Sequence, residues 1–240
     1  MAEYQKDNPE TIQAMFGSIA KQYDRTNGAL SFQLHRRWNR SLIKTVQNST
    51  SCNQILDLCC GTGEIAFGIL KNSEKPSEAF LLDFCSEMLI HAKEKAQKLD
   101  LKQHKLHYIQ ADAQQIPLPD ASVDYVTIAY GIRNVKDPFR CAKEAFRVLR
   151  KGGGFSILEL TQPENFLLRL GHSLYLKTFV PVLGKLLTSN RGAYAYLQNS
   201  IKTFIPPKDL EKLLQANSFQ RISRQSLTGG IATIISGIKE

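Results

Sequence analysis

The stretch Ile55-Leu56-Asp57-Leu58-Cys59-Cys60-Gly61-Thr62-Gly63-Glu64 decides the fold of this chain. Residues 55–58 are mostly apolar, as in a buried strand, with one acid, Asp57, near their end. A Gly-x-Gly turn follows, and the residues after it are typical of a helix. Parallel sheets build nucleotide-binding loops in this way, with the ligand held at the start of the helix. An ordinary tight turn between a strand and a helix remains the alternative.

The acid beside this turn narrows the choice of ligand. Gly61, Gly63 and Ala66 also fit the dinucleotide fingerprint. A pyrophosphate prefers positive surroundings at a helix N-terminus, and the carboxylate of Asp57 would repel it. A cation such as the sulfonium of S-adenosylmethionine would be tolerated or attracted. The stretch therefore favours an S-adenosylmethionine site that includes Asp57, Gly61 and Gly63.

Runs typical of strands alternate with runs typical of helices, which is the pattern of a parallel sheet. The expected strands are Gln54–Leu58, Ala79–Asp83, Leu106–Gln110, Val123–Ala129, Phe155–Glu159 and an antiparallel pair, Gln220–Ser226 and Ile231–Gly237. The expected helices are Glu64–Lys71, Ser86–Leu99, Pro138–Arg150 and Pro207–Ala216. A glycine of Lys151–Gly154 is expected to cap the third of them. The predicted fold is α/β, a doubly wound, mostly parallel seven-stranded sheet.

Two segments lie outside this alternating pattern. Residues 11–46 are expected to form N-terminal helices in front of the sheet, and residues 163–204 a helical insertion after the fifth strand. The insertion is rich in leucine and phenylalanine but is interrupted by Arg169, His172 and Lys177. It is too charged to span a bilayer, yet amphipathic enough to cover an apolar substrate or to touch a membrane surface. Simple packing of these helices on the core is the alternative.

Composition limits the class of protein. The chain of 240 residues is 42% hydrophobic and 22% charged, as expected for one globular domain with a full core. The polar N-terminus does not resemble a signal peptide, and the five cysteines include no Cys-x-x-Cys pair, so we expect reduced thiols and a cytoplasmic location. The net charge of +9 is dispersed; it fits a solvated basic surface, or a nucleic acid, anionic membrane or acidic ligand.

Two further acids complete a plausible cofactor site. Asp83 ends the second expected strand, 22 residues after Gly61 (83 − 61), where a carboxylate can accept hydrogen bonds from ribose hydroxyls. Asp112 and Ala113 follow the third strand, where the acid can accept a hydrogen bond from an adenine amine. Each acid alone could be an ordinary surface or turn residue, but the set is far more specific than any member.

The chain resembles class I S-adenosylmethionine-dependent methyltransferases and, within them, the ubiquinone/menaquinone biosynthesis C-methyltransferases. The segments that carry the resemblance are Phe16–Asp24, Leu30–Trp38, Gly131–Val135, Leu158–Pro163, Tyr194–Ile201 and Leu227–Ile231. They extend over nearly the whole chain. The Tyr-Asp, His-Arg-x-Trp and Gly-Ile-Arg-Asn sequences within them are specific to this family.

The resemblance implies the roles of several cofactor residues. Thr62, Asp83, Asp112 and Ala113 would contact S-adenosylmethionine, together with the glycine turn. Family members often have serine or another small residue at the position of Ala129, so only a backbone contact is expected there. The implied substrate is a prenylated quinol. We favour demethylmenaquinol; the demethoxy-ubiquinol precursor is the alternative.

Carbon methylation of a quinol ring requires an electron-rich carbon, which deprotonation of the neighbouring hydroxyl supplies. We expect Arg133 to stabilise the resulting oxyanion, directly or through water, although a structural tie to a buried acid is the alternative. The guanidinium group of arginine stays protonated and cannot accept a proton, so water or another group must take it. Tyr23, Asp24, His35 and Asn134 are further candidates for contacts with ring hydroxyls.

Other chemistries fit less well. We find no clustered acids for a metal and no Pro-Cys nucleophile, and Ala129-Tyr130-Gly131-Ile132 replaces the Asn/Asp-Pro-Pro-aromatic loop of amine methylation. An RNA methyltransferase and a non-catalytic cofactor-binding protein are the alternative classes; we expect no nucleic-acid partner. Contact with the inner membrane surface and a homodimer formed through the insertion are further expectations.

Overall fold

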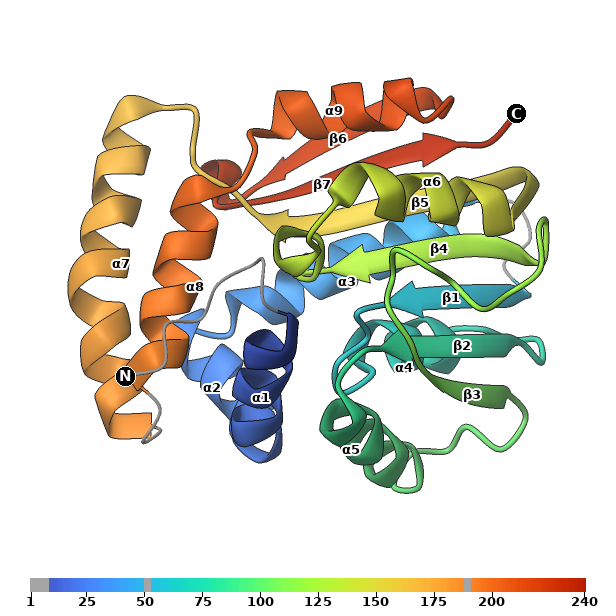
Figure 1. Ribbon diagram of the computed structural model, residues 1–240, viewed down its shortest axis with the longest axis horizontal. Helices are drawn as coiled ribbons and strands as arrows, with labels where there is room; N and C mark the ends of the chain where they lie inside the picture. The colour runs from blue at the N-terminus through green and yellow to red at the C-terminus, as the bar shows by residue number, and fades with distance from the viewer. Residues whose placement is uncertain (1–8, 50–52, 188–190) are drawn as a thin grey trace.

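A seven-stranded sheet organises the molecule (Figure 1). The computed structural model describes residues 9–49, 53–187 and 191–240. The strands are β1 (Gln54–Leu58), β2 (Glu78–Asp83), β3 (Lys105–Gln110), β4 (Val123–Ala129), β5 (Leu149–Leu160), β6 (Gln220–Leu227) and β7 (Ala232–Ile238). Their order is β3-β2-β1-β4-β5-β7-β6, with β7 antiparallel to both of its neighbours and the other pairs parallel. The predicted fold class, including the antiparallel pair, is confirmed.

Helices cover both faces of the sheet because strand side chains alternate between the faces. On one face, α6 (Pro138–Val148) and α9 (Pro207–Ala216) pack on Leu56, Leu58 and Phe155. On the other face, α3 (Leu34–Gln47), α4 (Glu64–Lys71) and α5 (Ser86–Ala96) pack on Ile55, Leu81 and Leu158. The sheet is therefore doubly wound, as the alternating pattern predicts.

The prediction of a glycine cap after residue 150 is wrong. Helix α6 ends at Val148, its C-cap Leu149 is extended (φ −69°, ψ 138°), and β5 begins there. The glycines lie within β5, next to a register shift against β4. A Cβ on Gly153 would come within 2.8 Å of the Asp124 carbonyl oxygen. Glycine is therefore required for close approach to β4 rather than for a helix cap.

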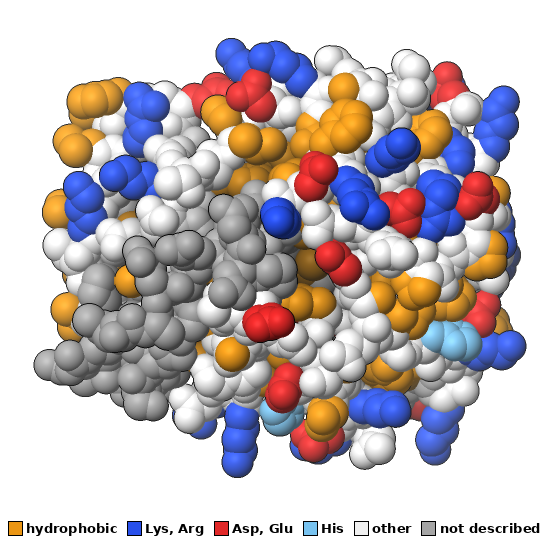
Figure 2. Space-filling model, in the orientation of Figure 1, with side chains coloured by type: hydrophobic (Ala, Val, Ile, Leu, Met, Phe, Trp, Pro, Cys, Tyr) orange, Lys and Arg blue, Asp and Glu red, His pale blue; other side chains and the backbone are white. Residues whose placement is uncertain are grey.

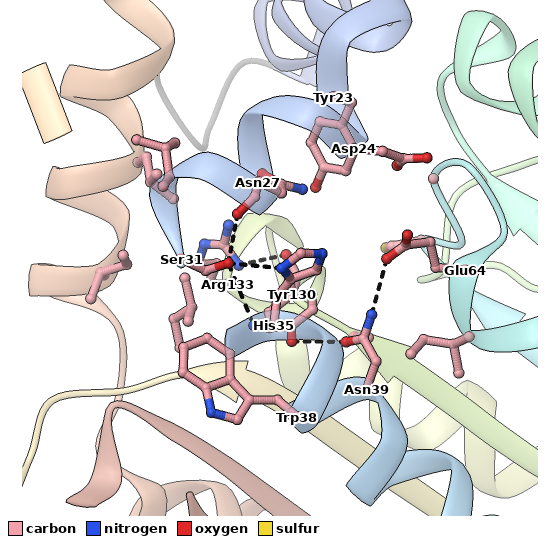
Figure 3. Close-up of a pocket in the computed structure, with 18 of the residues that line it drawn as sticks. Tyr23, Asp24, Asn27, Ser31, His35, Trp38, Asn39, Glu64, Tyr130 and Arg133 are labelled. Atoms are coloured by element: carbon pink, nitrogen blue, oxygen red, sulfur yellow. Dashed lines mark hydrogen bonds between the residues drawn. The ribbon is translucent and has the colours of Figure 1, made fainter. Parts of the chain in front are cut away.

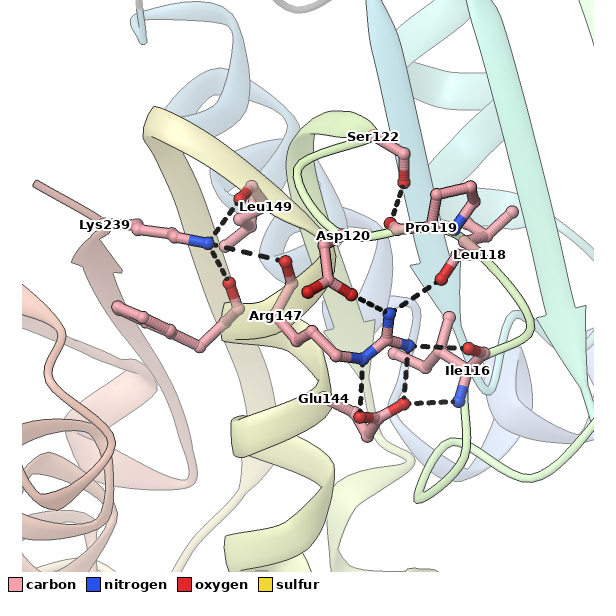
Figure 4. Close-up of polar contacts among 10 residues, drawn as sticks. Ile116, Leu118, Pro119, Asp120, Ser122, Glu144, Arg147, Leu149 and Lys239 are labelled. Carbon is pink, nitrogen blue, oxygen red and sulfur yellow. Dashed lines mark hydrogen bonds and ion pairs between the residues drawn. The ribbon is translucent and has the colours of Figure 1, made fainter.

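Lysine takes over the capping role at the end of α6 (Figure 4). The Lys239 ammonium group donates hydrogen bonds to the carbonyl oxygens of Phe146 and Leu149, both at 2.7 Å. A cation at a helix C-terminus also interacts favourably with the helix dipole. A residue directly after the C-terminal strand β7 (Ala232–Ile238) thus stabilises the end of a helix that lies far away in the sequence.

The proline-rich segment before β4 is held by one arginine (Figure 4). Arg147 of α6 pairs with Glu144 at 2.8 Å and with Asp120 at 2.7 Å. It also donates to the carbonyl oxygens of Ile116 and Leu118, each at 2.8 Å. Two prolines leave this segment with few backbone donors of its own, so a side-chain anchor sets its path.

The predicted N-terminal helices and helical insertion are both present. They comprise α1 (Pro9–Ile19), the 3₁₀ turn η1 (Ala20–Gln22), α2 (Tyr23–Leu30), α3, α7 (Phe166–Leu187) and α8 (Arg191–Thr203). In Figure 1, α1, α2, α7 and α8 lie beyond the carboxyl ends of the parallel strands. Leu30 of α2 packs with Leu176, Val180 and Ile201 of α7 and α8, so the two segments form one cover.

Among the described residues, no helix is long and apolar enough to cross a bilayer. Cys59, Cys60, Cys85 and Cys141 are free thiols. Cys52 and residues 188–190 of the predicted insertion lie outside the described residues.

Candidate active site

A cavity opens at the carboxyl ends of β1 and β4 and is covered by α2, α3, α7 and α8 (Figure 3). We call it the central cavity. Its walls include the glycine loop, the N-terminal helices, the segment after β4 and the insertion. The predicted residues that line it are Tyr23, Asp24, His35, Asp57, Gly61, Thr62, Ala129 and Arg133. Ligands of doubly wound sheets bind at this edge, so these predictions converge on one site.

A second hollow, the side cavity, lies next to the central cavity. Asp112, Ala113 and Asn134 line it, and Cys59 lines both cavities. The structure thus places the expected adenine contacts beside the glycine loop. Of the predicted substrate contacts, Asn134 alone lies in the side cavity.

Asp83 holds the glycine loop in place. Its carboxylate accepts hydrogen bonds from the backbone N–H of Gly61 at 2.8 Å and of Cys85 at 2.9 Å. Burial raises the pKa of Asp83 to about 6, and the backbone donors oppose this rise. Acceptor oxygens at the end of β2 are suited to ribose hydroxyls, which donate.

The Asp57 side chain of β1 forms hydrogen bonds with both β4 and α4. One oxygen accepts from the Thr127 hydroxyl of β4 at 2.8 Å, and the other from the Ala66 N–H of α4 at 3.3 Å. The residue is only 1% exposed, and burial raises the pKa of its carboxyl to about 7. Near neutral pH the site can therefore exist with or without this negative charge.

Asp24 of α2 binds the glycine loop through a hydrogen bond with Thr62. The Thr62 hydroxyl donates to the Asp24 carboxylate at 2.6 Å, and the Lys95 ammonium group of α5 pairs with the same carboxylate at 2.7 Å. Lys95 also lies 3.6 Å from Glu64. Asp24 therefore sits over the loop that is expected to hold the cofactor. Lys95 was not predicted, because it is one of several lysines along α5 and its spacing carries no signal.

Arg133 is bound to a buried acid. Its Nη1 donates to Glu159 at 2.5 Å and to the Tyr130 carbonyl oxygen at 2.5 Å. Burial lowers the pKa of Arg133, but the charge and hydrogen bond of Glu159, together with Tyr23 and Tyr196, outweigh burial, so the pKa of Arg133 is raised. The Nε of Arg133 is buried and has no hydrogen-bond partner among the described residues. A buried donor without a partner is costly, which points to an acceptor supplied by a ligand.

Glu159 was missed by sequence reasoning, although a signal exists. It is an acid inside the otherwise apolar end of β5, and it is fully buried. Buried acids are almost always paired. An acid within an apolar strand therefore predicts a nearby cation, and Arg133 is that cation.

The hydrogen bonds around Ser31 assign the tautomer of His35 (Figure 3). The Ser31 hydroxyl donates its only proton to the Asn27 carbonyl oxygen at 2.6 Å, so it must accept from His35 Nδ1 at 2.7 Å. His35 Nδ1 is therefore protonated, and Nε2 carries a lone pair. Burial lowers the pKa of His35, which keeps the ring neutral. A neutral histidine with a free lone pair in a cavity is equipped to accept a proton.

Two predicted contacts are themselves positioned by the protein. Burial raises the pKa of the Tyr23 hydroxyl, and the nearby Arg133 charge opposes the rise. The Asn134 side-chain oxygen accepts from the Tyr196 hydroxyl of α8 at 3.0 Å. The insertion thus reaches the segment after β4 through Tyr196, a contact that sequence spacing does not reveal.

A polar chain crosses the floor of the central cavity (Figure 3). The Tyr130 hydroxyl donates to Asn39 at 2.9 Å, and the Asn39 amide donates to Glu64 at 3.0 Å. These hydrogen bonds connect α3 to the first turn of α4.

In the described part of the chain, no group of three His, Cys, Asp or Glu side chains could hold a metal ion.

Comparison with proteins of known sequence gives close matches. The chain is 53% identical over 239 residues to a protein of Protochlamydia amoebophila (strain UWE25) named demethylmenaquinone methyltransferase, covering 100% of this chain and 99% of the other. It is 39% identical over 229 residues to the ubiquinone/menaquinone biosynthesis C-methyltransferase UbiE of Bartonella quintana (strain Toulouse), covering 95% and 88%.

Comparison with solved structures supports the architecture. A SAM-dependent methyltransferase from Aquifex aeolicus matches with a TM-score of 0.64 at 17% identity, covering 93% of this chain and 98% of the other. A possible histamine N-methyltransferase from Thermotoga maritima matches with a TM-score of 0.62 at 19% identity, covering 95% and 99%. At these identities the likeness establishes the fold alone.

The sequence model of one family spans almost the entire molecule. The ubiE/COQ5 methyltransferase family matches residues 4–239. The match includes the sheet, the N-terminal helices and the insertion, and it confirms the resemblance carried by the Tyr-Asp, His-Arg-x-Trp and Gly-Ile-Arg-Asn segments. The chain therefore belongs to the ubiE/COQ5 methyltransferase family.

Proposed function

We propose that this protein is an S-adenosylmethionine-dependent enzyme that methylates a ring carbon of demethylmenaquinol, a prenylated quinol, to form menaquinol. The observation that carries the proposal is 53% identity, over the full chain, to a protein named demethylmenaquinone methyltransferase. The glycine loop that opens into a partly apolar cavity supports it. Residues 1–240 would form one methyltransferase domain, with residues 163–204 covering the substrate.

The residues of the two cavities fit S-adenosylmethionine. Asp83, which binds the glycine loop, and Asp112, which lines the side cavity with Ala113, offer acceptor oxygens for ribose hydroxyls and the adenine amine. Gly61, Thr62 and Ala129 lie where the reactive end would enter the central cavity. When bound, the cofactor would supply the electrophilic methyl group that the quinol ring accepts.

His35 and Arg133 would share the activation of the quinol. The ring hydroxyl gives its proton to Nε2 of His35, which the Ser31 hydrogen bond keeps unprotonated. The oxyanion would accept a hydrogen bond from Nε of Arg133, a buried donor that has no hydrogen-bond partner in the described part of the chain. The ring carbon beside the oxyanion would then bond to the methyl group as the S–CH3 bond of S-adenosylmethionine breaks and its electron pair stays on the sulfur of S-adenosylhomocysteine. That carbon would lose its own proton to water, which restores the aromatic ring, and His35 would return its proton to the oxyanion.

Substrate trials test this function directly. The protein is incubated with S-adenosylmethionine carrying a labelled methyl group, and with prenylated demethylmenaquinol, the demethoxy-ubiquinol precursor or total RNA. Mass spectrometry should locate one added methyl group on the ring carbon of demethylmenaquinol. Transfer only to the ubiquinol precursor would favour the alternative pathway, salt-sensitive transfer to RNA would contradict the proposal, and cofactor binding without transfer would indicate a non-catalytic protein.

The prenylated substrate also bears on location. Such a quinol partitions into lipid, so we infer that the enzyme works from the cytoplasm at the surface of the inner membrane. The exposed apolar side chains of α7, including Leu167 and Leu174, support this inference. A second copy of the chain is the alternative occupant of that face.

A further inference from the structure

Much of the net positive charge of the chain lies in a stretch that begins inside the insertion and ends four residues after it. Residues 165–208 contain no aspartate or glutamate. They contain six basic residues, Arg169, Lys177, Lys185, Arg191, Lys202 and Lys208, so this stretch contributes +6 (6 − 0) to the net charge of +9. The predicted dispersal of charge holds for the lysines around α5 but not here.

Three of these cations line a groove between α7 and α8, which we call the α7–α8 groove. They are Arg169, Lys177 and Lys202, and the amides of Gln198 and Asn199 lie beside them. Among the described residues, no acid lines the groove, and the three cations form no ion pair within 4.0 Å. Cations and amide donors without an acidic partner suit a phosphate group.

Apolar side chains surround this cationic groove. Phe166 and Leu170 line its edge and are 66% and 59% exposed. Leu167, Leu168 and Leu174 continue the exposed apolar surface along α7. On the left of Figure 2, over α7, hydrophobic side chains lie next to lysine and arginine side chains. An apolar surface next to cations matches the two parts of a phospholipid, its acyl chains and its phosphate.

We propose that the α7–α8 groove binds the phosphate headgroup of an anionic phospholipid and docks α7 on the membrane surface. This inference rests on the proposed function, because a lipid-dissolved substrate gives the docking its purpose. His172, Leu176 and Ile201 line both the groove and the central cavity. A docked headgroup would therefore lie one layer of side chains away from the site of methyl transfer.

A second copy of the chain fits this surface less well. Symmetric pairing through α7 would bring two acid-free, cationic stretches together, and like charges repel. An anionic membrane supplies the opposite charge over a wide area.

Vesicle binding tests the proposal. The full-length protein is sedimented with vesicles of phosphatidylcholine alone and of phosphatidylcholine mixed with phosphatidylglycerol. We expect binding to the mixed vesicles. The triple variant Arg169→Gln/Lys177→Gln/Lys202→Gln should lose roughly a hundredfold in affinity for them, since each basic residue near such a surface contributes about 1 kcal/mol. Lys71→Gln/Lys98→Gln/Lys102→Gln removes the same charge from exposed positions elsewhere and should bind as the wild type does.

Three results would overturn the proposal: equal binding of the wild type to both vesicle types, equal loss in the control variant, or complete release by inorganic phosphate at constant ionic strength, which would indicate a free-phosphate site. A wild-type dimer that the groove variant dissociates without vesicles would assign the face to a second copy. Turnover of the wild type on a short-chain quinol in free solution tests the proposed function separately, because no membrane is involved.

Discussion

At the scale of single residues, the proton on His35 depends on Ser31. Because the Ser31 hydroxyl donates to Asn27, it can only accept from Nδ1 of His35. Nε2 therefore carries the lone pair of a ring that lines the central cavity. Such an arrangement keeps the basicity of the ring modest, since burial lowers its pKa.

Replacing His35 by glutamine should lower kcat by roughly a hundredfold, the usual contribution of a general base. In the wild type, kcat/KM should fall on the acid side as His35 becomes protonated. Because the pKa of His35 is lowered from 6.5, the pH at which kcat/KM falls to half should lie below 6.5. The variant should lack this acid limb. Steady-state rates from pH 5 to 8 measure it, and Ser31→Ala, which frees the other tautomer, should give an intermediate loss. An unchanged acid limb in the glutamine variant would exclude His35 as the base.

Arg133→Lys keeps a positive charge but removes Nε, the donor for which the described residues offer no acceptor. We expect kcat to fall by roughly a hundredfold, as for the loss of one oxyanion donor, while calorimetry shows unchanged binding of S-adenosylmethionine. Wild-type turnover in this variant would assign Arg133 to structure alone.

Glu159 is expected to act through Arg133 rather than on the substrate. Glu159→Gln leaves the arginine charge buried without a counter-ion and should lower the free energy of unfolding by about 3 kcal/mol. Denaturant unfolding measures the loss. Glu164→Gln is the matched control: it removes an exposed carboxylate whose pair with Arg224 lies at the surface, and it should cost less than about 1 kcal/mol.

At the scale of elements, one arginine connects α6 to the segment before β4. Arg147→Ala should reduce the free energy of unfolding by about 2 kcal/mol, because it strips carbonyl oxygens and two carboxylates of their shared donor. Arg140→Ala, on the same helix and exposed, should stay within about 0.5 kcal/mol. Chemical denaturation of the three proteins makes the comparison, and equal stabilities would show that the segment needs no anchor.

Elements with a strong repeating pattern could be predicted from the sequence. The strand β1 and the helix α4 have the predicted bounds because apolar residues, glycines and flanking polar residues all indicate the same boundaries. The glycine cap was predicted wrongly because Lys151–Gly154 looks like a helix end, whereas tertiary contact with β4 requires glycine there. Local signals cannot report a close approach to a distant strand.

The site was predictable where it lies on one motif, and not where it depends on packing. Asp83 ends β2 and Asp112 follows β3, so topology alone brings them to one edge of the sheet. Glu159, Ser31 and Tyr196 acquire their roles from contacts across elements, which spacing along the chain does not encode.

At the scale of the whole molecule, two buried acids couple stability to pH. Their carboxyls have pKa values of about 7 (Asp57) and about 6 (Asp83), above those of an unfolded chain. Between about pH 4 and 7 the folded state holds more protons than the unfolded state, so their contribution to stability decreases as pH rises. At neutral pH the two acids therefore lower the free energy of unfolding, although they lie at the edge of the sheet where the cofactor is expected to bind.

Asp57→Asn should remove the share that belongs to Asp57. Relative to the variant, the wild type should lose about 2 kcal/mol of unfolding free energy between pH 5 and 7.5. Denaturant titrations of both proteins at these two pH values provide the difference. A difference that does not change with pH would show that Asp57 is ionised throughout.

The wall shared by the central cavity and the α7–α8 groove has a kinetic consequence. An enzyme docked there draws its quinol from two dimensions, so its rate follows the mole fraction of quinol in the bilayer rather than the amount per volume of solution. Adding inert lipid at fixed total quinol should therefore slow turnover by surface dilution, although every protein and substrate molecule is still present.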